Sequence, residues 1–520
     1  MSLFRRETKI NSGQGENRIE ALLDQELLKM PGTSTKISWG DCVEGVLIMG
    51  STGSGKSSGP GKHIAMAMLR QGFGFCILCA KNDERKRWEE YAQKAGRTDD
   101  LVIMNKSTGL KFNLLEYEMN REGEGAGDVL NIVNALMNLN EQNKVHLSAA
   151  SGSEDRFWDN ALRRLIARIA SFLKLGGETL SILKMQIILS ESFNSDDVKL
   201  YNHLVNISLT KEKIEATERK EAIDQLEAWR KRSLFLRLFE KIKTTEFATE
   251  EQQSEAQMVI DFWIKEFANL SERPRSIVLE SLMGVIEPFL NPGILKSQFS
   301  EGVSEELVPS NIIKNKKIVI IDFPIKEFGI SAIYASTLYK TAFQAAFERR
   351  DITTEDDLKP ISLWIDEYQN FCNPTNDTLF QLTARSSWVS SIFITQNLNN
   401  IYFVMGDKQP EARTKSLLGN LNLKIFASNS DSDTNQWASD MIGQHLSVLE
   451  NLTVSPEGKK TKAFNQQLMP RILPDHFTTL RTGGLANKLK VDAVVFKPGK
   501  SWIYDDKVQN YGIVEFDQSD

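Results

Sequence analysis

The chain has 520 residues, of which 41% are hydrophobic and 25% are charged, and its formal net charge at pH 7 is −6. These values exclude a largely disordered protein and one whose whole surface attracts nucleic acid, and the length predicts several domain-sized units. The sequence holds no uncharged apolar run of roughly 18 residues, and its four cysteines are too few for a disulfide framework, so we expect a cytoplasmic protein without direct membrane insertion, either free or recruited to the inner membrane by a partner.

Residues 1–40 form a polar leader with a short helical pattern, and residues 41–115 alternate between strand and helix patterns. The expected strands are Val46–Met49, Gly74–Ala80 and Leu101–Met104, and the expected helices are Ile64–Leu69 and Glu84–Ala95. Alternation at this spacing predicts an α/β fold with a mostly parallel sheet covered on both faces. Cys76 and Cys79 have C-x-x-C spacing inside an apolar strand, so we interpret them as core residues, with a redox or metal role as the alternative.

Residues 116–310 differ in character, because helical periodicities replace the strand patterns. Trp158, Leu162 and Leu165, for example, fall on one buried helix face. The segment predicts an inserted all-α domain, in which the mixed charges of Lys211–Lys243 indicate a long exposed helix. Five of its arginines either contact DNA or belong to solvated helix faces: Arg163, Arg164, Arg168, Arg230 and Arg232.

Strand patterns return in residues 311–490, which we expect to complete the sheet. The expected strands are Lys317–Asp322, Ile361–Ile365, Ser391–Ile394 and Leu423–Phe426, and a helix is expected at Ser331–Arg350. Residues 491–520 alternate as a short hairpin around Pro498–Gly499 and finish in an acidic tail.

A glycine-rich motif with a specific chemistry lies between the first expected strand and the first expected helix. Its glycines let successive backbone N–H groups point at phosphate oxygens. Lys56 is expected to reach the β- and γ-phosphates of ATP, and the Ser57 hydroxyl is expected to ligate Mg²⁺. The predicted nucleotide-binding residues are Gly50, Ser51, Thr52, Gly53, Ser54, Gly55, Lys56, Ser57 and Ser58.

ATP hydrolysis also needs a carboxylate element on a neighbouring strand. Asp366 and Glu367 directly follow the strand Ile361–Ile365. We predict that Asp366 holds Mg²⁺ and that Glu367 orients or deprotonates the attacking water, although the pair could instead cap the next helix. Asp322 is the weaker candidate, because it is a single acid at the end of its strand.

Three further polar residues are candidates for catalysis. Gln396 follows the next apolar strand, where it either senses the γ-phosphate or is an ordinary strand-end residue. Arg385, and after it Arg413, are candidates for a cation that one subunit donates to the nucleotide of its neighbour, with an ordinary surface arginine as the alternative.

The order of these motifs resembles that of the conjugative coupling ATPases of type IV secretion, the TraG/TraD type. Further segments that resemble family motifs are Cys79–Asp83, Phe112–Leu115, Phe157–Trp158, Glu287–Pro292, Leu418–Asn420, Met441–Gly443 and Arg471–Asp475. Three departures accompany the resemblance. Cys79 stands where the family has an acid, Leu114 stands where it has a proline, and its usual N-terminal transmembrane helices have no counterpart in the sequence.

The resemblance implies a RecA-like P-loop NTPase domain in two parts, residues 41–115 and 311–490, around the all-α domain of residues 116–310. It also implies a ring, with six subunits as the expected number, that binds ATP and Mg²⁺ and translocates single- or double-stranded DNA or a DNA–protein complex. Secretion-channel or relaxase-like proteins would be its partners. Two alternatives stay open: ATP-dependent recruitment of substrates without strand translocation, and a related motor in DNA processing or in defence against mobile DNA.

Overall fold

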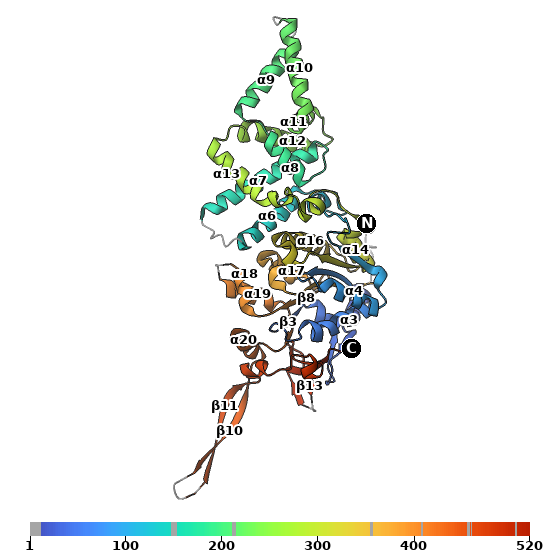
Figure 1. Cartoon of the computed structure of the whole chain (residues 1–520), viewed down its shortest axis with the longest axis vertical. Helices are drawn as coiled ribbons and strands as arrows, with labels where there is room; N and C mark the ends of the chain where they lie inside the picture. The colour runs from blue at the N-terminus through green and yellow to red at the C-terminus, as the bar shows by residue number, and fades with distance from the viewer. Residues whose placement is uncertain are drawn as a thin grey trace, which may run out of the picture. The chain divides into compact units, whose positions relative to one another are not determined.

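The computed structural model describes residues 12–519, apart from residues 147–152, 211–214, 354–356, 407–408, 455–457, 459 and 505–506. The chain divides into two compact units (Figure 1). Unit 1 comprises Met1–Met104, Pro309–Ser336 and Phe343–Asp520, and unit 2 comprises Asn105–Val308 and Thr337–Ala342.

Unit 1 is built around a nine-stranded sheet with the strand order β15-β12-β9-β3-β8-β7-β4-β6-β5. In that order the strands span Tyr511–Asp517, Lys490–Phe496, Leu423–Phe426, Val46–Met49, Val389–Thr395, Ile361–Ile365, Gly74–Cys79, Ile318–Asp322 and Leu101–Met104. The strands from β9 to β5 are parallel, whereas β12 pairs antiparallel with both β9 and β15. The predicted α/β class with a mostly parallel sheet is therefore confirmed.

The central strands are continuous apolar runs because helices cover both of their faces. Every residue of β3, β4, β7 and β8 is buried. The apolar side chains Ile48, Ile77 and Ile392 belong to one core cluster with Trp364. This packing fixes the carboxyl ends of β3, β7 and β8 side by side, and these ends carry the polar residues singled out from the sequence.

The C-terminal strands differ from the expected simple hairpin around Pro498–Gly499. The strand β12 pairs with β15, and a second hairpin, β13 (Trp502–Tyr504) with β14 (Lys507–Gln509), lies between them in the sequence. The ring of Trp502 is fully buried and lies so close to Gly512 that a side chain there would meet it at 2.9 Å. The second hairpin therefore places the Trp502 ring in the core cluster that also contains Val514 and Phe516 of β15.

A long two-stranded ribbon was not expected from the sequence. It consists of β10 (Gln444–Val454) and β11 (Lys460–Pro470), which pair antiparallel along their whole length. Leu446 pairs with Leu468, and both side chains are exposed, as is that of Phe464. The ribbon therefore presents an apolar face to solvent.

Within the described residues, unit 2 contains helices and no strand. The helices are α5 (Leu114–Asn120), α6 (Val129–His146), α7 (Ser153–Leu175), α8 (Ile182–Glu191), α9 (Ser195–Leu209), α10 (Ala216–Arg232), α11 (Leu234–Thr244), α12 (Glu250–Asp261), η3 (Phe262–Phe267) and α13 (Glu272–Ile286), followed by the short turns η4 (Glu287–Phe289), η5 (Leu295–Phe299) and η6 (Glu305–Leu307). Its core contains a cluster of rings in which Trp263 lies 5.7 Å from Phe172 and 5.3 Å from Phe235, centroid to centroid. None of the described helices of the chain combines the length and apolarity needed to cross a membrane.

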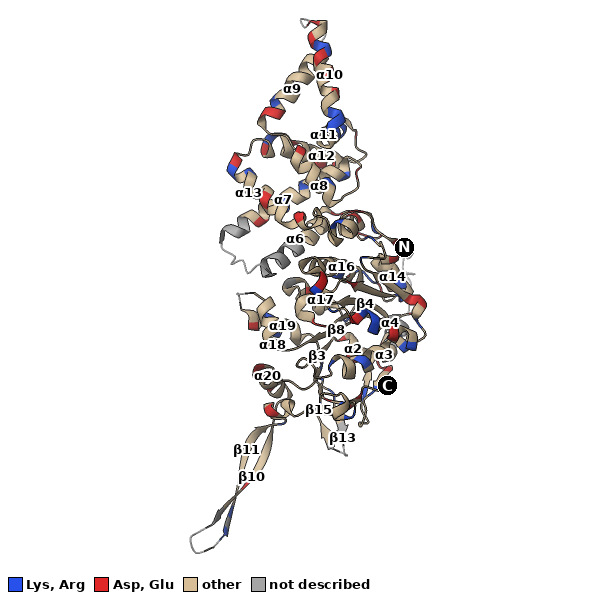
Figure 2. Ribbon diagram, in the orientation of Figure 1, with Lys and Arg blue, Asp and Glu red and all other residues tan. Residues whose placement is uncertain are grey.

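The long helix expected over Lys211–Lys243 is in fact two helices, and residues 211–214 lie outside the described part of the chain. Ser233 adopts an extended conformation between α10 and α11, and its side chain caps α11 by accepting a hydrogen bond from Leu236 N. Serine is strongly preferred at helix N-cap positions, so Ser233 marks the end of α10 and the start of α11. Charges of both signs are mixed along α10, as Figure 2 shows.

Candidate nucleotide-binding site

The glycine-rich loop runs from the end of β3 into a helix that begins with a π-turn, η1 (Ser57–Gly61), and continues as α3 (Lys62–Arg70). Gly53 and Gly55 have φ of 79° and 80°, a left-handed conformation that favours glycine. A side chain at Gly55 would also meet Val491 of β12 at 2.5 Å. The loop therefore leaves its backbone N–H groups uncovered by side chains at the helix N-terminus, an arrangement that binds anions.

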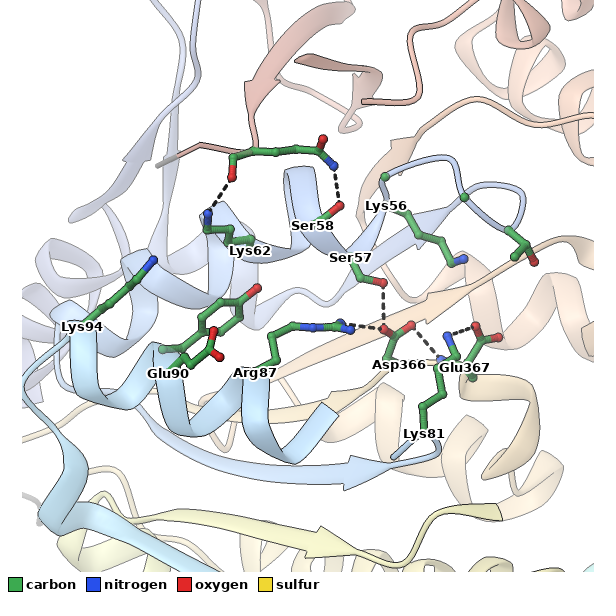
Figure 3. Close-up of a pocket in the computed structure, with 15 residues that line it drawn as sticks. Lys56, Ser57, Ser58, Lys62, Lys81, Arg87, Glu90, Lys94, Asp366 and Glu367 are labelled. Carbon is green, nitrogen blue, oxygen red and sulfur yellow. Dashed lines mark hydrogen bonds and ion pairs between the residues drawn. The ribbon is translucent and has the colours of Figure 1, made fainter. Parts of the chain in front are cut away.

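The cation of this loop, Lys56, has a buried side chain that points toward two carboxylates (Figure 3). Burial lowers its pKa, while the nearby charges of Glu367 and Asp366 act in the opposite direction. A buried cation that faces a cavity has a strong affinity for an anion, because an anion restores the electrostatic stabilisation lost on leaving water.

The Ser57 hydroxyl donates a hydrogen bond to Asp366 Oδ2 at 2.7 Å. The two residues lie 309 positions apart in the sequence, and they meet because β7 and β3 both flank β8 in the sheet. Mg²⁺ commonly takes one or two protein oxygen ligands and completes its shell with water and phosphate, so this pair of oxygens fits it. No cluster of three or more His, Cys, Asp or Glu side chains suited to a metal occurs among the described residues.

Glu367 is buried and adopts a left-handed backbone conformation with φ 58° and ψ 48°. Such a conformation costs a non-glycine residue about 1–3 kcal/mol and is often found at functional sites. Its carboxylate accepts hydrogen bonds from Lys81 Nζ at 2.5 Å, Gln369 Nε2 at 2.7 Å and Gln396 Nε2 at 3.0 Å. Burial alone would raise the pKa of Glu367, but the bonds from Lys81 and Gln369 outweigh it and lower the pKa, so the group is an anion near neutral pH.

Gln396 connects Glu367 to the glycine-rich loop. Its backbone oxygen accepts a hydrogen bond from Asn429 Nδ2 at 2.9 Å, and Asn429 Oδ1 in turn accepts one from Ser51 Oγ at 3.1 Å. A continuous polar network thus joins the carboxylate to the loop, through β8 and the segment that follows β9. A polar network whose bonds are satisfied rigidifies the groups that it joins.

The two other predicted arginines lie elsewhere in unit 1. Arg385 is exposed, and its guanidinium Nη2 lies 3.7 Å from Glu44 Oε1. Arg413 donates a hydrogen bond to Met405 O at 2.6 Å. Neither residue lines the cavity of its own chain. Asp322, the weaker acidic candidate, lies at the end of β6 and pairs with Arg85 at 2.9 Å.

The loop and the carboxylates line one cavity of about 400 Å³. Six predicted loop residues line it: Thr52, Gly53, Gly55, Lys56, Ser57 and Ser58. Gly50, Ser51 and Ser54 do not line the cavity. Ser54 instead packs against Gly50, so closely that a Cβ added at Gly50 would lie 2.5 Å from Ser54 Oγ.

Several residues of the cavity were not predicted from the sequence. Lys81 is the second residue after β4, a position at the carboxyl edge of the sheet that could have been recognised. Arg87 lies on α4 (Glu84–Lys94), and its Nη1 is 3.9 Å from Asp366 Oδ2. Gln518, which follows β15, also lines the cavity, and no motif marks it.

The remaining alternatives from the sequence involve cysteines and arginines. All four cysteines are buried, and burial raises the pKa of the Cys79 thiol well above its ordinary value. Arg164 and Arg230 form ion pairs with Glu266 and Glu240 at 2.5 and 2.6 Å, so both have carboxylate partners on the surface of unit 2.

Comparison with known proteins gives matches at the levels of sequence family and fold. Residues 360–480 match the family model described as the TraM recognition site of TraD and TraG. Among solved structures, the conjugative coupling protein TrwBdeltaN70 in its unbound monoclinic form matches with a TM-score of 0.53 and 13% identity, over 97% of this chain and 91% of that chain. No curated protein matches the chain.

Two nucleotide complexes of the plasmid coupling protein TrwB match equally well. The complex with the ATP analogue ADPNP has a TM-score of 0.53 and 13% identity, over 100% of this chain and 97% of that chain. The complex with ADP and Mg²⁺ has a TM-score of 0.52 and 14% identity, over 97% and 91% of the two chains. The chain has a RecA-like P-loop NTPase fold, and its predicted resemblance to the conjugative coupling ATPases is confirmed.

Proposed function

We propose that this chain is an ATPase of the conjugative coupling type. The observation that carries the proposal is the assembly of Ser57, Asp366 and Glu367 around one cavity that also contains the buried cation Lys56. A loop for phosphate, a pair of oxygens for Mg²⁺ and a polarised carboxylate are the groups that ATP hydrolysis requires. The family match and the fold of TrwB agree with this assignment.

Each group in the cavity has a distinct task. The loop N–H groups and Lys56 bind the triphosphate, and Ser57 with Asp366 would hold Mg²⁺, which neutralises charge on the phosphates when bound. Glu367 accepts a hydrogen bond from the attacking water and orients it. Its lowered pKa keeps it ready to accept that bond near neutral pH. Gln396, which donates to Glu367, adjusts the position of the carboxylate.

The mechanical part of the proposal rests on the family resemblance. Coupling ATPases act as rings, so we infer that six copies assemble, with ATP between neighbouring subunits, and move DNA through the centre. Exposed Arg385 is the candidate for the cation that reaches the neighbour's nucleotide.

The test is ATP turnover with no DNA, with single-stranded DNA and with double-stranded DNA. Stimulation by either form of DNA supports a translocating motor, and a rate unaffected by both would contradict it. Glu367→Gln is the matched variant, because the amide keeps the shape of the side chain but cannot act as a base. It should retain ATP binding while turnover falls by about 100-fold or more.

A second candidate function is favoured by one observation. The matching family model is described as a recognition site for another protein, TraM, and the ribbon β10–β11 lies within the matched residues 360–480. The chain would then use ATP binding to recruit protein substrates without moving a strand. In that case Glu367→Gln should recruit partners as well as the unaltered chain does, whereas a motor should lose transport in the same variant.

A further inference from the structure

Gln518 is held in place by four hydrogen bonds, two of which join it to the helix that begins at the phosphate loop. Its side-chain Nε2 donates to Ser58 Oγ at 2.6 Å, and its backbone oxygen accepts a bond from Lys62 Nζ at 3.0 Å. Its side-chain Oε1 accepts a bond from Gly484 N at 2.8 Å, and its backbone N–H donates to Leu489 O at 2.9 Å. The residue is therefore fixed in the wall of the cavity, beside the helix that begins at the loop.

The orientation of the Gln518 amide follows from these partners. A backbone N–H can only donate, so the atom that faces Gly484 must be the amide oxygen and the atom that faces Ser58 must be the nitrogen. The turn is built for this approach, because a side chain at Gly483 would meet Gln518 Oε1 at 2.4 Å. With its oxygen occupied by Gln518, the Ser58 hydroxyl keeps its own proton to donate to an anion.

The position of Gln518 along the cavity indicates which part of a nucleotide it faces. Figure 3 shows Lys56 and Glu367 at one end of the cavity, and Lys62, Glu90 and Lys94 toward the other end. The first end contains the groups proposed to act on the γ-phosphate. Ser58 follows the Mg²⁺-binding position, so the bonds of Gln518 to Ser58 and Lys62 place it at the end where the α-phosphate and ribose of the nucleotide would lie.

Charge in this part of the cavity suits an anion that receives hydrogen bonds. Lys62 and Lys94 line it against one carboxylate, that of Glu90. Cations and an amide N–H donor at the same wall favour the phosphate groups of a nucleotide over a neutral ligand.

We propose that Gln518 is a nucleotide-positioning residue, which holds Ser58 and Lys62 in place for the α-phosphate and ribose of the bound nucleotide. The inference rests on the proposed function of this cavity as an ATP site. It assigns a role in nucleotide binding to the segment after β15, which the sequence motifs do not mark. Because Ser58 and Lys62 would contact the same nucleotide groups in the substrate and in the transition state, loss of Gln518 should affect nucleotide binding rather than the chemical step.

Two substitutions at this position distinguish positioning from a purely structural role. Gln518→Glu keeps the oxygen that accepts from Gly484 but replaces the donor toward Ser58 with an anionic oxygen. Gln518→Ala removes both bonds without adding charge. If Gln518 only anchors the turn at Gly484, Glu should behave like the unaltered chain and Ala should be the more damaging change. If Gln518 serves the nucleotide, the order should be reversed.

The measurements are the dissociation constant of a fluorescent ADP analogue and the steady-state kcat and KM for ATP. We expect weaker binding and a higher KM by roughly threefold in Gln518→Ala and roughly tenfold or more in Gln518→Glu, with kcat nearly unchanged. Ser519→Ala is the matched control, because Ser519 is exposed and both its N–H and its hydroxyl donate to Asp517 Oδ1, away from the cavity, so this variant should bind the analogue like the unaltered chain. Equal affinity in all four proteins, or the structural order of the two variants, would overturn the inference. Failure of the unaltered chain to bind the analogue would instead contradict the ATP site itself.

Discussion

A buried lysine in the sheet beside the phosphate loop gives a stability prediction with a calculable size. Lys424 lies in β9, paired in register with Leu47 of β3, and its side chain is 3% exposed. Burial lowers its pKa from 10.5 to about 8, and its Nζ donates a hydrogen bond to Leu421 O. We predict that Lys424→Met stabilises unit 1 at pH 7, because methionine fills the same space without a charge.

The size of the effect follows from the pKa difference. A shift of this size corresponds to about 3 kcal/mol of unfavourable burial, since one pKa unit is about 1.4 kcal/mol. Loss of the bond to Leu421 O offsets about 1 kcal/mol of that gain, which leaves a net stabilisation of about 2 kcal/mol at pH 7.

The pH dependence has a definite sign. At pH 7 the lysine is charged in both states, so the full cost is present. Between pH 8 and 10.5 the folded chain releases its proton first, so the unfolded chain binds more protons and stability rises with pH. This rise should be missing in Lys424→Met.

The assay is urea unfolding at pH 7 and at pH 9.5, followed by tryptophan fluorescence. Lys415→Met is the matched control, because Lys415 is an exposed residue of unit 1 and its substitution should change stability by less than about 0.5 kcal/mol. A variant that is less stable than the unaltered chain at pH 7, or a gain of the same size at both pH values, would refute the reasoning.

Further predictions concern the cavity. Lys56→Ala should weaken ATP binding by about 100-fold or more, measured by equilibrium titration, because the triphosphate loses its buried cation; near-normal turnover would contradict the whole assignment. In Lys81→Met the pKa of Glu367 should rise, since Lys81 lowers it, so the acidic limb of the kcat profile should move to higher pH; an unmoved limb would remove Glu367 from the rate-limiting chemistry. Arg385→Ala should leave nucleotide affinity unchanged while assembled rings lose turnover by about 1,000-fold; full activity in rings would exclude it as the cation supplied to the neighbour.

Much of the site could be predicted because its residues follow strong local patterns. The loop Gly50–Ser58 and the pair Asp366 and Glu367 each stand directly after an apolar strand, and parallel strands bring such ends to one edge of the sheet. Lys81, which helps to hold Glu367 as an anion, lies two residues after β4. It belongs to the segment Cys79–Asp83, whose resemblance to a family motif did not assign it a role. Gln518 had no signal at all, because its position depends on the antiparallel pairing of β12 with β15.

The failures in the fold have similar causes. The helix expected over Lys211–Lys243 is interrupted at Ser233, because this one residue caps the next helix. The pattern of charged residues continues across Ser233 and gives no sign of the boundary. The ribbon β10–β11 was not predicted because its apolar side chains are exposed. Strand prediction assumes that the apolar side chains of a strand face a core, and those of the ribbon do not. The expected domain boundaries stay a prediction.

The adjacency of β5 and β6 has a consequence for how the protein folds during synthesis. Residues Asn105–Val308 of unit 2 lie between these neighbouring strands in the sequence. During synthesis β5 therefore cannot pair with β6 until the ribosome has made all of these residues. At 5–20 residues per second this delay is on the order of 10 s or more. During that time β3, β4 and β5 all lack their partner strands, because no two of them are neighbours in the sheet. The cost of closing so long a loop falls if unit 2 has already folded. We therefore expect the helical unit to mature on the ribosome before the sheet that surrounds it in the sequence is complete.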